Sequence, residues 1–239
     1  MSALTWILLG IDGLALLMIL SLFIFLRYFV YSFLACNRRI YPAEILIVEG
    51  WLEELSLSAV IDEFNHGAYQ YLVTVGGPWS MGPCLAQNET VAEIHMAEGS
   101  LYLMSCLAHY TTLAELAAAK LIALDFEPRK LITVASEEVS RDRTVATAIA
   151  FKKWLSEHKG DVRGVNIYSN NIHARRSHLI YQKHLPKLKV GVIAGKVYRY
   201  APDRWWQSSL GLKTILMELI AYCYVVYRSI RTPSADYDY

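Results

Sequence analysis

Several short motifs of well-known enzyme classes are missing from this chain of 239 residues. It contains no G-x-G-x-x-G, no G-x-x-x-x-G-K-[ST], no G-x-S-x-G and no H-E-x-x-H. Their absence removes the usual signatures of dinucleotide binding, nucleoside triphosphate binding, α/β-hydrolases and zinc proteases. A functional site must therefore be inferred from where polar residues fall on the predicted fold.

The chain also lacks any C-x-x-C pair and any excess of one charge. Its four cysteines lie far apart, which excludes a zinc knuckle or a thioredoxin-type motif, and its seven histidines show no metal-ligand spacing, so we expect no metal. Lys and Arg total 23 against 22 Asp and Glu, and the net charge of +1 gives no general attraction for nucleic acid. An anion site must therefore be local, and composition identifies no cofactor.

What the chain does have is a long hydrophobic run near its N-terminus. Between Leu4 and Ala35 the only charged residues are Asp12 and Arg27. A bilayer-spanning helix needs about 20 mostly apolar residues. Residues 1–36 are therefore predicted to be a single transmembrane anchor, with the lipid bilayer as a partner. The alternative is a cleaved signal peptide, but no basic start precedes the run and no small-residue cleavage site follows it, which favours the anchor.

The arginines around this run bear on its orientation in the membrane. Arg27, Arg38 and Arg39 lie at its end or after it, and no Lys or Arg precedes it. By the positive-inside rule, this distribution favours a cytoplasmic position for the rest of the chain.

The remainder of the chain alternates short apolar runs with helical patterns. Short runs rich in β-branched residues and bounded by glycine or polar residues are typical of buried strands. They occur at residues 45–48, 71–75, 131–134, 165–168 and 190–194. Apolar residues at helical spacing predict helices at residues 55–64, 111–126, 142–158 and 173–184. This alternation predicts one α/β domain over residues 43–230, with a doubly wound, mainly parallel sheet covered by helices on both faces.

Three segments fit the alternation less simply. Residues 78–110 are long enough for a lid or binding loop, or for a small packed subdomain without a binding role. Residues 205–230 predict an aromatic-rich C-terminal helix, which either closes the fold with its apolar stripe on the sheet or lies on the membrane interface. Glu218 in mid-helix argues against a second membrane span, and we favour the closing helix. The tail at residues 231–239 is predicted to be disordered.

Polar residues and glycines follow four of the predicted strands. Ligands of open parallel sheets bind beyond the carboxyl ends of the strands, where loops converge and helix N-termini present N–H groups. We therefore expect these loops to meet at one crevice. The ligand-binding candidates there, including one at the start of the helix at residues 111–126, are Glu49, Gly50, Gly76, Gly77, Glu115, Ser136, Arg141, Asp142, Arg143, Thr144, Ser169, Asn170, Arg175 and Arg176.

The segment from His173 to Arg176 carries the most specific chemistry. His173 and Arg176 lie three residues apart at the start of a helix and so share a face. The positive end of the helix dipole makes Arg175 and Arg176 unfavourable there unless an anion or carboxylates compensate. The pattern predicts a phosphate or carboxylate site, with His173 as a candidate catalytic acid or base. In the alternative interpretation the arginines only hold the loops together, by pairing with Glu137, Glu138 or Asp142.

Some of these candidates also match patterns of local structure. Asp142 is placed as an N-cap for the helix that follows it. Thr112 and Glu115 match a capping box. Gly76 and Gly77 indicate either a tight turn or a close approach of the backbone to a ligand.

These loops resemble the YdcF-like domain family, which includes the bacterial envelope proteins SanA and ElyC. The similarity runs from about Ala43 to Ala194, and its last two elements are the most specific. The elements are the first strand, Thr74-Val75-Gly76-Gly77, the stretch from Thr112 to Glu115, Asp142-Arg143-Thr144 with Ala148, and Ser169 to the His-Ala-Arg-Arg at residues 173–176. The chain departs from the family in its first loop, Glu49-Gly50-Trp51, where glycine is usually more frequent, and in the length of residues 78–110.

The resemblance implies a Rossmann-like fold, often with an N-terminal membrane helix, and a role in bacterial cell-envelope biogenesis at the inner membrane. It implies a periplasmic domain, in contrast to the arginine distribution. We expect the site to bind a phosphate-bearing ligand, such as a lipid-linked precursor, through Arg143, Arg175 and Arg176. Two alternatives remain: a non-catalytic assembly factor that contacts membrane-protein partners, and an enzyme that binds a nucleotide or S-adenosylmethionine.

Overall fold

The protein contains a sheet of five parallel strands. The computed structural model describes residues 3–52, 54–78, 110–158 and 162–231, and most of the expected 78–110 insertion and 231–239 tail lies outside these ranges. The strands follow each other in space in the order β3-β2-β1-β4-β5. Their bounds are β1 Ile45–Glu49, β2 Tyr71–Gly76, β3 Leu131–Ala135, β4 Gly164–Ser169 and β5 Lys189–Ala194. All five predicted strands are confirmed, with small differences at their ends.

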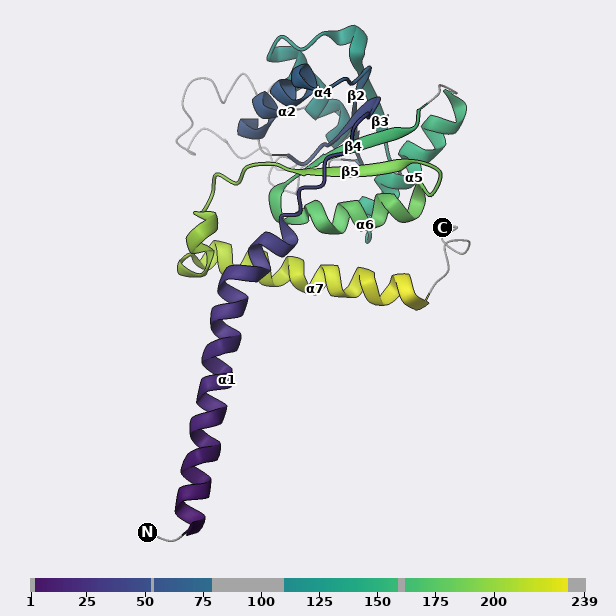
Figure 1. Ribbon diagram of the computed structural model, residues 1–239. Coiled ribbons are helices and arrows are strands. Elements are labelled where there is room, and N and C mark those ends of the chain that lie inside the picture. Colours follow the sequence, from purple (N-terminus) through teal and green to yellow (C-terminus); the bar gives the residue numbers. More distant parts are fainter. Residues whose placement is uncertain (1–2, 53, 79–109, 159–161, 232–239) are drawn as a thin grey trace, which may run out of the picture.

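Helices cover both faces of the sheet (Figure 1). On one face, the side chains of Leu46 and Val48 pack with those of α2 (Glu54–His66) and α4 (Leu113–Ala123). On the other, Ile45 and Ile47 pack with α5 (Arg143–Glu157) and α6 (Ala174–His184). The central strand β1 is buried on both sides, which explains the unbroken apolar run at residues 45–48. These four helices confirm the predicted alternation and the α/β class.

The order of the strands reverses direction at β1. From β1 the chain builds outward to β2 and β3, and then returns to place β4 on the other side of β1. Val48 near the end of β1 lies beside Tyr168 of β4, so the residues that follow, Glu49 and Ser169, are neighbours. In open parallel sheets such a reversal opens a crevice between the loops that leave the two strands in opposite directions.

Two long apolar helices complete the structure. Helix α1 (Ala3–Leu34) extends away from the sheet, and α7 (Ser209–Arg231) lies below α6, across the end of α1 (Figure 1). Both are long and apolar enough to cross a membrane by length and composition. The described side chains of α1 from Leu14 to Phe29 are largely exposed and apolar, while Val30 and Leu34 pack with α7.

The last helix does not close the fold in the expected way. We predicted that its apolar stripe would pack on the sheet, but α7 packs against α6 and α1 instead. Its buried residues are Gly211, Ile215 and Glu218. Because a buried carboxylate requires partners, this helix is fixed to the domain by polar contacts as well as by apolar ones.

Candidate functional site

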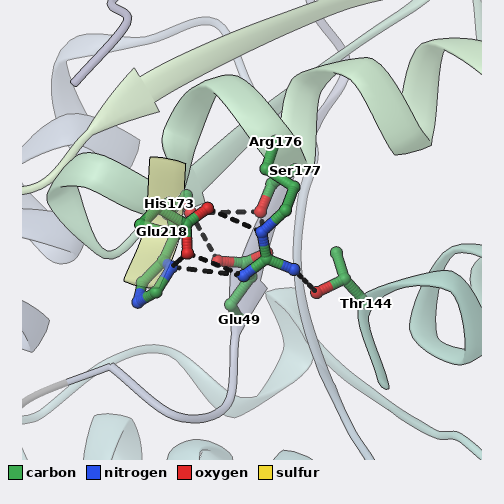
Figure 2. Close-up of polar contacts among 7 residues, drawn as sticks. Glu49, Thr144, His173, Arg176, Ser177 and Glu218 are labelled. Atoms are coloured by element: carbon green, nitrogen blue, oxygen red, sulfur yellow. Dashed lines mark hydrogen bonds and ion pairs between the residues drawn. The ribbon is translucent and has the colours of Figure 1, made fainter. Parts of the chain in front are cut away.

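The first part of the site is a buried carboxylate at the end of β1 (Figure 2). Glu49 has no exposed surface. Its Oε2 accepts a hydrogen bond of 2.5 Å from Ser169 Oγ at the end of β4, and its Oε1 accepts one of 2.6 Å from Ser177 Oγ on α6. Burial raises the pKa of the Glu49 carboxyl, and the two serine hydroxyls offset only part of that effect.

The second part joins the start of α6 to the middle of α7. Arg176 Nε donates to Glu218 Oε1 at 2.6 Å, and Arg176 Nη2 donates to Glu218 Oε2 at 3.0 Å. His173 Nδ1 hydrogen-bonds to the same Oε2 atom. The guanidinium also reaches Thr144 Oγ1 on α5, at 3.5 Å. Glu218 therefore has both carboxylate oxygens occupied by two basic side chains, as Figure 2 shows.

The electrostatics of this group keep the ion pair charged. Burial alone would raise the pKa of the Glu218 carboxyl, but hydrogen bonds from His173 and Arg176 outweigh it and lower that pKa. Burial likewise acts to lower the pKa of the Arg176 guanidinium, whereas the hydrogen bond to Glu218 and its negative charge raise it. A bidentate arginine–carboxylate pair in this setting is geometrically rigid.

The same contacts orient the imidazole of His173. Arg176 Nη2 also lies 3.2 Å from His173 Nδ1, but the contact of Nδ1 with Glu218 is closer. Because a carboxylate only accepts hydrogen bonds, we assign the proton between His173 and Glu218 to Nδ1. The other ring nitrogen, Nε2, points away from the ion pair in Figure 2. Nε2 of the neutral ring is then an acceptor, and in the imidazolium it becomes a donor. This orientation leaves one nitrogen of His173 for a ligand.

A small hollow of about 170 Å³ lies beside His173. It lies next to the loop after β4 and the start of α7, and Arg199 brings an exposed positive charge to it. The hollow is smaller than pockets that hold drug-sized ligands, which measure roughly 300–1,000 Å³, and its size suits one polar group. Its lining consists of Asn170, Asn171, Ile172, His173, Val197, Arg199, Tyr200, Leu210 and Thr214.

The predicted basic residues separate into different places. Arg176 belongs to the site, together with the polar candidate Thr144. Arg175 instead points toward α1, where its Nε donates to the Phe33 carbonyl and its guanidinium lies 4.0 Å from the Phe33 ring centroid. Arg143 is exposed at the start of α5. Arg141 lines a separate hollow of about 410 Å³ beside β3 and α5.

Asp142 has a different role from the one predicted. It occupies the N-cap position of α5 in the left-handed backbone region, with φ of 56°, and its side chain caps no N–H group. Its carboxylate instead accepts a hydrogen bond of 2.6 Å from Arg228 Nη1 on α7. The alternative interpretation, in which the arginines pair with carboxylates of the chain, is confirmed for Arg176, but its partner is Glu218 and not Glu137, Glu138 or Asp142.

The glycines after β1 and β2 allow a close approach of protein backbone. A Cβ atom on Gly50 would lie 2.5 Å from the Leu113 carbonyl oxygen, and one on Gly76 would lie 2.6 Å from the Ala114 nitrogen. Gly77 is less restricted, since its nearest neighbour would be the hydroxyl of the buried Ser136 at 3.1 Å. Gly50 and Gly76 thus serve the packing of α4 against the strand ends.

The predicted capping box at the start of α4 is confirmed. Glu115 N donates to Thr112 Oγ1 at 3.2 Å, and Thr112 N donates to Glu115 Oε2 at 3.0 Å. Thr111 also donates to the same oxygen from its N–H and its hydroxyl. These bonds lower the pKa of the Glu115 carboxyl. The role of Glu115 that the structure shows is to cap the helix.

Sequence reasoning missed Glu218 and Arg199 as site residues. A signal existed for Glu218, because a lone acidic residue inside an apolar helix must find partners when it is buried. No comparable signal marked Arg199, which follows β5 in an irregular segment. Within the described ranges, no group of three or more His, Cys, Asp and Glu side chains is placed to hold a metal ion.

Comparison with known proteins adds no relative: neither the family models nor the curated proteins give a match to this chain.

Proposed function

We propose that this protein is a membrane-anchored member of the YdcF-like family in bacterial cell-envelope biogenesis, whose Rossmann-like domain binds a phosphate-bearing ligand such as a lipid-linked precursor. In this proposal α1 is a single-pass anchor in the inner membrane. The strand order β3-β2-β1-β4-β5 supports the fold, since it matches the order of Rossmann-type sheets up to the fifth strand. The exposed apolar surface of α1 supports the anchor.

The observation that carries the ligand proposal is the placement of His173. Glu218 holds its Nδ1, and His173 lines the hollow that Arg199 also lines. A bound phosphate would receive a hydrogen bond from Nε2–H of the imidazolium and a second from the Arg199 guanidinium. Charge-assisted hydrogen bonds of this kind are about twice as strong as neutral ones.

Arg176 supports this site indirectly. Its guanidinium is engaged by Glu218, so it fixes His173 through that carboxylate and leaves direct anion contact to His173 and Arg199. This arrangement changes the role inferred for the basic turn at residues 173–176. Arg176 is a positioning residue, and His173 is the group that exchanges a proton with the ligand if a reaction occurs.

The proposal is tested by titrating the purified full-length protein in detergent micelles with geranylgeranyl phosphate and with inorganic phosphate. We expect His173→Gln and Arg199→Gln each to weaken binding about tenfold or more, because a hydrogen bond to a charged group contributes about 1.5–3 kcal/mol. Arg129→Gln is the matched control, since Arg129 is exposed at the opposite end of the sheet.

Arg199 is exposed, so its replacement is expected to leave the unfolding temperature unchanged and to report on binding alone. Equal affinities for wild type, Arg199→Gln and Arg129→Gln would overturn the proposed site, as would the absence of binding to wild type. Tight binding of inorganic phosphate with no preference for the prenyl phosphate would retain the anion site and reject a lipid-linked ligand.

The nucleotide alternative receives less support. Glycine-rich loops bring their backbone next to nucleotide phosphates. Here Gly50 and Gly76 bring the strand ends next to the backbone of α4 instead.

A further inference from the structure

Helix α7 presents an apolar stripe that no described residue covers. The stripe repeats every three or four residues, which places its members on one helical face. Their exposed fractions range from 43% for Leu212 to 80% for Ile230. The stripe consists of Leu212, Leu216, Ile220, Tyr224, Tyr227 and Ile230.

The opposite face of α7 fixes the direction of this stripe. Ile215 is buried against α1, and Glu218 is held by Arg176 and His173. Near its start the helix also approaches the preceding 3-10 helix, η4 (Pro202–Gln207), closely, since a Cβ atom on Gly211 would lie 2.5 Å from the Trp205 carbonyl oxygen. Rotating α7 to bury its apolar stripe would expose Ile215 and break the Glu218 ion pairs. The stripe therefore faces away from the domain.

The stripe lies on the side of the domain from which α1 departs. In Figure 1, α7 runs across α1, and the N-terminal part of α1 extends away from the domain on the side of α7 that is opposite to the sheet. The two helices meet where Val30 and Leu34 pack with Ile215 and where the rings of Phe33 and Tyr222 stand 5.4 Å apart. If α1 crosses a bilayer, α7 is held along the bilayer surface with its stripe toward the lipid.

The depth of the stripe agrees with this placement. A helix has a radius of about 5 Å with its side chains, so the outer face of α7 lies about 5 Å from its axis. Because α1 rises 1.5 Å per residue, this distance corresponds to about three residues of α1, counted toward its N-terminus from the contacts with α7. Counting from Val30, that level falls at Arg27 and Tyr28, where Arg27 interrupts the apolar run of α1. The stripe thus lies at about the level of this charged residue along α1.

Residues at this level have the chemistry of a membrane interface. The Arg27 guanidinium lies 3.9 Å from the Trp206 ring centroid, and Trp205 Nε1 donates to the Arg27 carbonyl at 3.1 Å. Arg27 Nε is buried without a hydrogen-bond partner among the described residues. At the far end of α7, the Arg231 guanidinium lies 4.8 Å from the Tyr227 ring. Trp, Tyr and Arg concentrate at the headgroup level of bilayers.

We infer that α7 is an interfacial helix whose apolar stripe inserts into the same lipid bilayer that α1 crosses. This inference rests on the proposed anchoring by α1. It identifies the lipid bilayer as the surface against which the domain rests, and it places the hollow beside His173, which Leu210 and Thr214 of α7 help to line, close to the headgroups. Interfacial helices bind a bilayer by burying an apolar face of this kind at the boundary between headgroups and acyl chains.

The test uses full-length protein in lipid nanodiscs with a single bimane-labelled cysteine, after replacement of the four native cysteines. The label is placed at Ile220 in the stripe, at Leu20 in α1, or at Ile122 on α4. Ile122 is the matched control, because it is an exposed isoleucine, 46% accessible, on the far side of the sheet from α7. Spin-labelled lipids then measure proximity to the bilayer, and circular dichroism with thermal unfolding confirms the fold of each variant.

We expect strong lipid quenching at Leu20 and Ile220 and less than a tenth as much at Ile122. Quenching at Leu20 without quenching at Ile220 would overturn the inference and retain the anchor. Absence of quenching at both positions would reject the anchor and the inference together. A label at Ile220 that is shielded from aqueous iodide but not reached by spin-labelled lipid would also overturn the inference, because a protein partner or a second copy would then cover the stripe.

Discussion

Glu218, in the middle of α7, accepts a hydrogen bond of 2.6 Å from Arg176 Nε at the start of α6, and the same carboxylate binds His173. The candidate site and the C-terminal helix therefore share one side chain. A displacement of α7 would move Glu218 and, with it, the imidazole of His173, since one oxygen of the Glu218 carboxylate contacts both His173 and Arg176. If α7 rests on the bilayer, the membrane contact helps to set the position of the proposed ligand-binding group.

Replacing Glu218 with Gln should destabilise the protein strongly. The substitution removes one partner of a buried ion pair and leaves Arg176 charged, which costs about 3–5 kcal/mol. The free energy of unfolding from urea titration of the full chain in detergent measures the effect. Glu127→Gln is the control: Glu127 pairs with Lys130 on the surface, and its loss should cost less than about 1 kcal/mol. Similar losses for the two variants would contradict a structural role for the Glu218 pair.

The strands were predictable because their sequences report burial directly. Every residue of β1 and β4 is buried, and both strands contain short runs rich in β-branched residues that can be recognised without knowledge of their neighbours. The partner of Arg176 was not predictable in the same way. Glu218 lies 42 residues further along the chain, and only the packing of α7 below α6 brings the two together.

Arg175 shows the corresponding limit within one helix. Consecutive residues on a helix point about 100° apart, so Arg175 and Arg176 cannot serve the same crevice. Pattern analysis identified the basic turn but could not decide which arginine faces the sheet. The orientation of α6 follows from the burial of Ala174 and Ser177, and in this orientation Arg175 points toward α1.

Replacing Arg175 with Ala should loosen the junction between α1 and the domain while leaving the candidate site intact. The guanidinium of the half-buried Arg175 lies against the Phe33 ring and donates to the Phe33 carbonyl, and a cation–π contact contributes about 0.5–1 kcal/mol or more. We expect faster amide hydrogen exchange at residues 30–34 and an affinity for geranylgeranyl phosphate within twofold of wild type. A loss of affinity as large as that of Arg199→Gln would contradict the placement of Arg175 outside the site.

Gly76→Ala should destabilise the fold through a steric conflict with α4. The added Cβ atom would lie 2.6 Å from the Ala114 nitrogen and 2.8 Å from Leu113 Cβ, and overpacking of this kind costs about 1–3 kcal/mol. Gly77→Ala is the matched control, because its closest contact would be a serine hydroxyl at 3.1 Å that can rotate away. Neither glycine has a positive φ, so the comparison is free of backbone strain. Equal unfolding temperatures for the two variants would contradict the explanation.

Glu49→Gln should stabilise the protein, and by more as the pH rises. Burial raises the pKa of the Glu49 carboxyl above its ordinary value of 4.5, so the folded state favours the protonated form. The stability that this group contributes is complete below pH 4.5 and is lost as the pH rises through the raised pKa. Glutamine cannot ionise and keeps a partner for Ser169 and Ser177, so it avoids that loss.

Urea titrations of wild type and Glu49→Gln across pH 4 to 8 measure the difference. The two free energies of unfolding should agree near pH 4, and the advantage of the variant should grow by at most about 1.4 kcal/mol per pH unit above 4.5 until the raised pKa is passed. Glu115→Gln should behave oppositely, because the pKa of that carboxyl is lowered by its hydrogen bonds at the cap and its charge is favourable at neutral pH.

A constant difference between wild type and Glu49→Gln across the pH range would show that Glu49 does not change its protonation on folding. A variant that is more stable at pH 8 but binds the phosphate probe less well would show that the buried charge is retained for function at a cost in stability.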